Sequence, residues 1–196
     1  MREAPFLSFV TAPAVTESTQ IYSVGHSTRS EADFLALLRS FQIVQLADIR
    51  TLPGSNRHPQ FNSQNLEAVL PKLGIGYAHL PKLGGLRRGL GPHSPNRGWR
   101  NANFRGYADH MLTAEFEEGL AELLGLPRPL AMMCAEAVPW RCHRSLVADA
   151  LLVRGIVVSH IIGVSRASPH QLTSFAKVDG ARLTYPAEKE PGPKEP

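Results

Sequence analysis

Short apolar segments alternate with segments of helical periodicity along the chain. The apolar segments predict β-strands and cover residues 20–24, 43–50, 75–80, 129–135 and 156–162. After the first of them, apolar residues recur at the helical spacing i, i+3, i+4 and i+7, at Phe34, Leu37, Leu38 and Phe41. Ser30 precedes this stretch, and its hydroxyl can cap the first turn, so we expect a helix to begin near residue 30.

Four further helical stretches continue the alternation. One has an apolar stripe at Leu66, Val69, Leu70 and Leu73. Pro71 lies inside this stripe and should kink the helix or end it early, because proline has no N–H to donate. Two helices are predicted within 104–124 and another within 146–151, followed by Gly155 as a C-terminal cap. The pattern predicts an α/β fold, a three-layer sandwich with a mostly parallel sheet of about five strands flanked by helices.

The 196 residues are expected to contain one α/β domain, over residues 20–165. Residues 1–19 show no periodicity, which predicts a flexible N-terminus. Residues 166–196 are expected to be a C-terminal extension that ends in a disordered tail rich in Pro, Glu and Lys, because such a composition cannot bury a core.

Composition narrows the cellular setting. No segment approaches the roughly 18 apolar residues that a membrane helix needs, so we expect no membrane partner. Only two cysteines, Cys134 and Cys142, are present, which excludes a disulfide scaffold and favours a reducing, cytoplasmic location. The formal net charge of +4 is too small for a histone-like polycation.

The positive charge is concentrated in the middle of the chain. Residues 50–105 contain nine basic side chains and one acidic side chain, Glu67. Within this segment, the arginines of the loop 86–105 are interleaved with Trp99 and Phe104. Cations beside flat rings suit phosphate contact and base stacking, but the same pattern is also typical of a solvated basic loop.

Polar and titratable residues recur at the carboxyl ends of the predicted strands. In a parallel sheet, ligands bind at this edge because the loops there meet the amino ends of helices. We therefore expect one pocket that brings these residues together. The catalytic candidates are His26, Asp48, Glu136, Cys142 and His143, and the ligand-binding candidates are Ser27, Arg50, Ser55, His79, Gly84, Gly85, Cys134, Arg141 and Arg144.

The segment 134–145 has the strongest chemical pattern, because it joins a buried strand to the start of a helix. Unpaired N–H groups and the helix dipole favour an anion there, and Arg141 and Arg144 add fixed positive charge. The same field would lower the pKa of Cys142 and could make it a nucleophile. Cys134 ends an apolar strand. It could contribute to the ligand site, or it could equally be a small hydrophobic residue packed in the core.

Several candidates have a structural alternative. Asp48 could act as a general base, or its carboxylate could tie down its own loop. His26 could carry protons or serve only as a hydrogen-bonding residue. Gly84 and Gly85 permit close backbone approach, which is a weak phosphate signal.

Cofactors and metals are not expected. Cys134, Cys142 and His143, with His26 or His79, would be soft ligands. However, a C-x7-C-H spacing is not a recognised zinc pattern, so the sequence predicts no metal site.

The motifs resemble those of domain-of-unknown-function family 488. They are Gly25-His26-Ser27, Asp48-Ile49-Arg50-x-x-Pro53-x-Ser55, Tyr77-x-His79-Leu80-x-x-Leu83-Gly84-Gly85, Phe104-x-x-Tyr107-Ala108-x-x-Met111 and Met133-Cys134-x-Glu136-x-x-Pro139-x-x-Cys142-His143-Arg144. The resemblance covers roughly residues 21–163 and implies a compact α/β fold with a shared pocket, but no established reaction. A looser likeness to rhodanese and cysteine phosphatases stops at the fold, because six residues separate Cys134 from Arg141.

These patterns lead to a ranked set of functional hypotheses. The first is a phosphate-type anion pocket at the carboxyl edge of the sheet, which binds or acts on a nucleotide or nucleic acid. As an enzyme it would be a hydrolase or transferase, in which Arg50 and Arg144 hold phosphate. One alternative is a non-catalytic nucleic-acid-binding module that uses the loop 86–105. The other is cysteine-dependent sulfur or phosphoryl transfer through Cys142.

Overall fold

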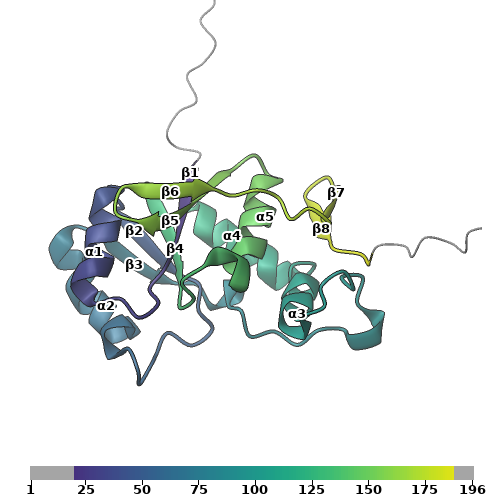
Figure 1. Cartoon of the computed structure of the whole chain (residues 1–196), viewed down its shortest axis with the longest axis horizontal. Helices are drawn as coiled ribbons and strands as arrows, with labels where there is room; N and C mark the ends of the chain where they lie inside the picture. The colour runs from purple at the N-terminus through teal and green to yellow at the C-terminus, as the bar shows by residue number, and fades with distance from the viewer. Residues whose placement is uncertain (1–19, 188–196) are drawn as a thin grey trace, which may run out of the picture.

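A six-stranded sheet forms the centre of the molecule (Figure 1). The computed structural model describes residues 20–187, so the predicted flexible N-terminus and the last part of the predicted tail lie outside the described residues. The strand order is β3-β2-β4-β1-β5-β6, and only the pairing of β5 with β6 is antiparallel. The strands are β1 (Gln20–Gly25), β2 (Gln45–Asp48), β3 (Gly76–His79), β4 (Leu130–Cys134), β5 (Val157–Gly163) and β6 (Arg166–Pro169).

Helices cover both faces of this sheet, which confirms the predicted three-layer α/β sandwich (Figure 1). One apolar core joins α1 and α2 to one face, and a second core joins α3, α4 and α5 to the other. No helix within residues 20–187 is long and apolar enough to cross a bilayer. The helices are α1 (Glu31–Ser40), α2 (Ser63–Val69), α3 (Ala102–His110), α4 (Ala114–Leu124) and α5 (Arg144–Leu152).

Alternation along β4 decides which face receives its terminal cysteine. Ala131 and Met133 pack in the core beneath α1 and α2, whereas Leu130, Met132 and Cys134 pack in the core beneath α3, α4 and α5. Successive strand residues point to opposite faces, so this arrangement follows from the period of two. Cys134 therefore lies on the same face as the start of α5.

Local signals placed the helix ends correctly. The Ser30 side chain accepts a hydrogen bond from the Asp33 N–H and caps α1. The second helix ends at Val69, and a single 3₁₀ turn, Leu70–Leu73, accommodates Pro71. Gly155 has a φ of +77°, the left-handed geometry that glycine adopts readily after a helix.

The sheet continues beyond the predicted domain boundary at residue 165. β6 begins directly after this boundary. Its four residues are all exposed and have no apolar alternation that could have predicted a strand. A separate hairpin of β7 (Lys177–Asp179) and β8 (Arg182–Thr184) follows. Leu183 and Tyr185 are buried in the core beneath α3, α4 and α5, so this part of the extension packs against the domain.

Candidate functional site

The strand order creates a crevice between β1 and β4. These neighbours pair in parallel up to Gly25 and Cys134. The chain leaves β1 toward α1 on one face of the sheet and leaves β4 toward α5 on the other face. Diverging loops at such a point open a ligand crevice outside the carboxyl ends of the strands. A cavity of about 680 Å³ lies there.

Most of the predicted site residues line this cavity. Those that do are His26, Ser27, Arg50, Ser55, Gly85, Cys134, Glu136, Arg141, Cys142 and His143. Four others lie behind the cavity wall, namely Asp48, His79, Gly84 and Arg144. The sheet therefore gathers segments that are more than 100 residues apart in sequence, and it separates the lining residues from those that support them.

Asp48 is a supporting residue. Its carboxylate is fully buried and accepts hydrogen bonds from the Arg50 N–H at 3.0 Å, from Arg50 Nε at 2.9 Å and from the Tyr77 hydroxyl at 2.8 Å. These contacts fit the loop-tying interpretation of Asp48 and leave it out of reach as a base for a ligand. Arg50 also donates through Nη2 to the Phe61 carbonyl, so Nη1 is its remaining group.

His26 is held as a neutral imidazole. Its Nδ1 lies 2.9 Å from the Ser27 carbonyl, which can only accept, so Nδ1 donates and Nε2 faces Arg50 Nη1 at 3.4 Å. The ring stacks on Phe61 with centroids 4.3 Å apart. Burial, aided by the Arg50 charge, lowers the pKa of His26 to about 4, so the ring is uncharged at neutral pH.

Arg144 does not reach a ligand in the cavity. Its side chain is 1% exposed, and its guanidinium donates to Ser23 Oγ at 3.2 Å, to the Glu136 carbonyl and to Cys142 Sγ at 3.4 Å. Instead of the predicted contact with phosphate, the buried Arg144 guanidinium has hydrogen-bond acceptors from three segments of the fold.

The start of α5 is also less open than the sequence suggested. The N–H groups of Ser145 and Leu146 donate to the carbonyls of Cys142 and His143, so these two groups are engaged in a tight turn. His79 has an internal role as well, because its Nε2 donates to the Arg50 carbonyl at 2.8 Å.

Two thiols and an imidazole meet at the cavity wall. Nδ1 of His143 lies 3.9 Å from Cys134 Sγ and 3.7 Å from Cys142 Sγ. The three donor atoms all lie within 4.8 Å of one another, and both cysteines are free. Cys134 is thus more than a packed core residue, since it also lines the cavity beside the second thiol.

The orientation of His143 is set by its other nitrogen. Nε2 lies 3.0 Å from the Ile49 carbonyl, so this nitrogen carries the proton and the lone pair of Nδ1 points toward the thiols. Gly85 packs directly against the ring, because a Cβ at this position would lie 2.4 Å from Nδ1. Gly84 is packed in the same way, because a Cβ at this position would lie 2.5 Å from Thr51 Oγ1. Both glycines therefore permit close packing of the loop against its neighbours.

The two thiols differ in acidity. A hydrogen bond from Cys134, together with the charge of the nearby Arg144, lowers the pKa of Cys142 well below its usual value. Cys134 is the donor in this pair, and that bond together with burial raises its pKa.

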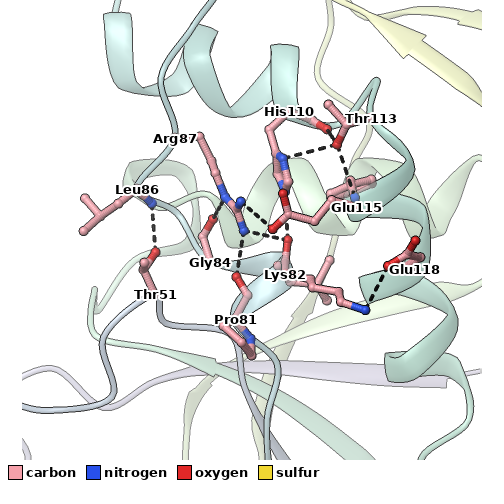
Figure 2. Close-up of polar contacts among 12 residues, drawn as sticks. Thr51, Pro81, Lys82, Gly84, Leu86, Arg87, His110, Thr113, Glu115 and Glu118 are labelled. Carbon is pink, nitrogen blue, oxygen red and sulfur yellow. Dashed lines mark hydrogen bonds and ion pairs between the residues drawn. The ribbon is translucent and has the colours of Figure 1, made fainter.

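Part of the basic middle segment is neutralised within the fold (Figure 2). The Arg87 guanidinium donates to the carbonyls of Pro81, Lys82 and Gly84 and pairs with Glu115 at 2.7 Å. The Lys82 ammonium pairs with Glu118 and Glu122 on α4. The net positive charge around this segment in the folded protein is therefore smaller than the sequence suggests, because acidic residues of α4 pair with its basic side chains.

Sequence reasoning missed two basic lining residues. Arg57 and His58 belong to the loop after β2 and line the cavity. Their place after the carboxyl end of a predicted strand is the same signal that indicates Arg50 and Ser55, so the sequence contains a signal for all four residues.

The comparisons with known proteins support the motif-based resemblance. Residues 30–151 match the family described as "Domain of unknown function DUF488", and this range includes all predicted site residues except His26 and Ser27. Neither curated proteins nor solved structures gave a match. Because the match covers more than half of the chain, the chain belongs to the DUF488 family.

Proposed function

We propose that the cavity binds a phosphate-bearing small molecule of the nucleotide type. The observation that carries this proposal is the charge of the wall, where Arg57 and Arg141 line the cavity with a single acid, Glu136, and Arg50 is already paired with Asp48. No carboxylate within residues 20–187 forms an ion pair with Arg57 or Arg141. Guanidinium groups without a carboxylate partner suit phosphate oxygens, which they can contact bidentately.

The apolar part of the wall favours a ligand that is larger than free phosphate. Leu52 and Leu86 are 70% and 72% exposed, and both line the cavity. Phe104 adds an aromatic surface. A volume near 680 Å³ falls in the range of small-molecule pockets, which is roughly 300–1,000 Å³. A phosphate attached to a flat ring would use both the cationic and the apolar parts.

Binding measurements on matched arginine variants test this proposal. Isothermal titration calorimetry would use AMP, ATP, inorganic pyrophosphate and a short single-stranded RNA. Arg57→Ala and Arg141→Ala should each weaken nucleotide binding about tenfold or more, since a charge-assisted hydrogen bond contributes about 1.5–3 kcal/mol. Arg39→Ala is the control, because Arg39 is an exposed arginine in the last turn of α1 and does not line the cavity.

The probes separate the sources of phosphate. Tighter binding of AMP or ATP than of pyrophosphate supports the nucleotide assignment. RNA binding that weakens with salt and is retained in all three variants would instead support the alternative in which the loop 86–105 binds nucleic acid. Nucleotide affinity that is the same in Arg57→Ala, Arg141→Ala and the wild type would reject the proposal.

The proposal includes a reducing, cytoplasmic setting. Both thiols are free and lie close together, an arrangement that persists where the cell keeps thiols reduced.

A further inference from the structure

The cluster of Cys134, Cys142 and His143 has the donor set of a soft metal site. Two thiolates and one imidazole are ligands that select zinc over magnesium or calcium. The sequence shows these three residues as possible soft ligands, but their C-x7-C-H spacing argues against a metal site. In the fold, a 3₁₀ turn at Pro139–Arg141 lies in the segment that joins the end of β4 to Cys142. The three donor atoms converge in space, to within 4.8 Å of one another, although seven residues separate Cys134 from Cys142 along the chain.

The distances match those of a tetrahedral site. Zinc binds sulfur at about 2.3 Å and nitrogen at about 2.0–2.1 Å, which places tetrahedral sulfur and nitrogen ligands about 3.5 Å apart. The two sulfur–Nδ1 distances in this structure are 3.7 and 3.9 Å. A shift of a few tenths of an ångström would bring each sulfur–nitrogen pair to the separation that zinc requires, and the two sulfur atoms lie within 4.8 Å of each other.

Neighbouring groups hold these donors as they do in metal sites. Nε2 of His143 donates to the Ile49 carbonyl, which fixes the tautomer that leaves Nδ1 available. Arg144 Nε lies 3.4 Å from Cys142 Sγ and can donate only, so it supports a thiolate there. These two contacts orient His143 and Cys142, and the residues that make them, Ile49 and Arg144, do not line the cavity.

We propose that Cys134 Sγ, Cys142 Sγ and His143 Nδ1 bind one Zn²⁺ ion, with the fourth coordination position open to the cavity. Both sulfur atoms bind the ion as thiolates, so the proton that Cys134 shares with Cys142 is released to solvent. Three protein ligands with one open position are typical of a site that accepts water or a ligand oxygen. This assignment is independent of the proposed nucleotide binding, although it places the ion beside the same cavity.

Metal titration of the reduced, metal-free protein tests the assignment. One equivalent of Zn²⁺ should bind the wild type, measured by competition with a chromophoric chelator. Co²⁺ should give a thiolate-to-cobalt charge-transfer band together with the visible bands of a tetrahedral site. The band in the wild-type protein reports thiolate ligation directly, so this arm does not depend on whether a variant folds.

Variants then assign the ligands. Cys134→Ser, Cys142→Ser and His143→Ala should each weaken Zn²⁺ binding by more than about 100-fold, since even outer contacts of a metal site contribute 10- to 100-fold. His58→Ala is the matched control, because His58 lines the cavity outside the cluster and should leave Zn²⁺ affinity unchanged. The Arg57→Ala and Arg141→Ala variants should also retain the ion, which separates this proposal from nucleotide binding.

Two results would overturn the zinc assignment. One is a folded, reduced wild-type protein that binds less than one equivalent of Zn²⁺ and gives no charge-transfer band with Co²⁺. The other is Zn²⁺ affinity that is unchanged in a folded Cys134→Ser/Cys142→Ser double variant.

Discussion

Single residues at the sheet edge hold the loops that form the cavity. Gly25 is the clearest example, because a Cβ there would lie 1.9 Å from the Glu136 carbonyl oxygen and 2.9 Å from Arg144 Nη2. The backbones of β1 and the loop after β4 can approach this closely only when residue 25 has no side chain.

Replacing this glycine should therefore destabilise the protein. Gly25→Ala is expected to lower the free energy of unfolding by at least about 2 kcal/mol, since overpacking against backbone cannot be relieved by a rotamer change. Gly54→Ala is the control, because the nearest atom to its added Cβ lies 3.8 Å away. Urea denaturation measures both, and equal stability of the two variants would contradict the close approach.

Substitution of Arg144 should lower the stability of the protein far more than substitution of Arg141. Arg144→Ala removes the partner of Ser23 and of the Glu136 carbonyl, so we expect a loss of about 3 kcal/mol in the free energy of unfolding. Arg141 is exposed, and Arg141→Ala should change stability by less than about 0.5 kcal/mol. Chemical denaturation would refute this contrast if Arg144→Ala were as stable as Arg141→Ala.

At the scale of elements, the loop after β3 is ordered by a buried carboxylate. Asp109 on α3 accepts hydrogen bonds from the Leu90 N–H at 2.8 Å, from Ser94 Oγ at 2.6 Å and from Asn96 Nδ2 at 2.8 Å. These contacts hold the arginine-rich part of the chain against α3 and satisfy buried polar groups of a glycine-rich loop.

Loss of this carboxylate should release the loop. Asp109→Ala is expected to accelerate tryptic cleavage after the exposed Arg88 and Arg97 several-fold under native conditions. Asp179→Ala, at an exposed aspartate in β7, is the control. The expectation fails if mass spectrometry finds the same cleavage rates at these two sites in both variants.

The elements that sequence predicts well are those with a local cause. Periodicity located the five core strands, the Ser30 hydroxyl identified the start of α1, and Pro71 identified the end of α2. β6 was missed because an exposed edge strand needs no apolar alternation. Its existence depends on hydrogen bonds to β5, and a pattern of side chains does not record those bonds.

The candidate site was predictable in place but not in detail. The carboxyl-edge rule brought together the correct segments, because it depends only on a parallel sheet. The burial of Arg144 was not predictable, since the groups that satisfy it, Ser23 and the Glu136 carbonyl, come from two other segments. The convergence of Cys134, Cys142 and His143 was not predictable for a similar reason. Their spacing argues against a metal site, but a spacing rule contains no information on how residues 135–141 fold.

At the scale of the whole molecule, buried histidines link stability to pH. His160 on β5 contacts His170 at 3.0 Å, and His170 contacts Asp149 on α5 at 2.8 Å. Burial, together with the charges of His170 and Arg144, lowers the pKa of His160 from 6.5 to about 4. The folded protein therefore keeps His160 neutral over a range in which the unfolded chain binds a proton.

This difference predicts acid destabilisation with a defined sign. Stability from His160 is fully present above pH 6.5 and is lost as the pH falls toward about 4, at up to about 1.4 kcal/mol per pH unit. His160→Gln should make the fall in unfolding free energy between about pH 7 and about pH 5 shallower. Urea titrations at each pH measure it, and an identical slope in the variant would exclude His160 as a source.

The buried position of Tyr185 has a consequence for how the protein is made. Its hydroxyl donates to Asp149 at 2.8 Å, its N–H donates to Asn96 Oδ1 at 2.8 Å, and its ring is fully buried beside Trp99. Asp149 on α5 and Asn96 in the loop after β3 can therefore form their hydrogen bonds to Tyr185 only after residue 185 has left the ribosome. Nascent chains that stop before this residue should bind chaperones longer than chains that extend past it, because they expose the apolar surface that Leu183 and Tyr185 later cover.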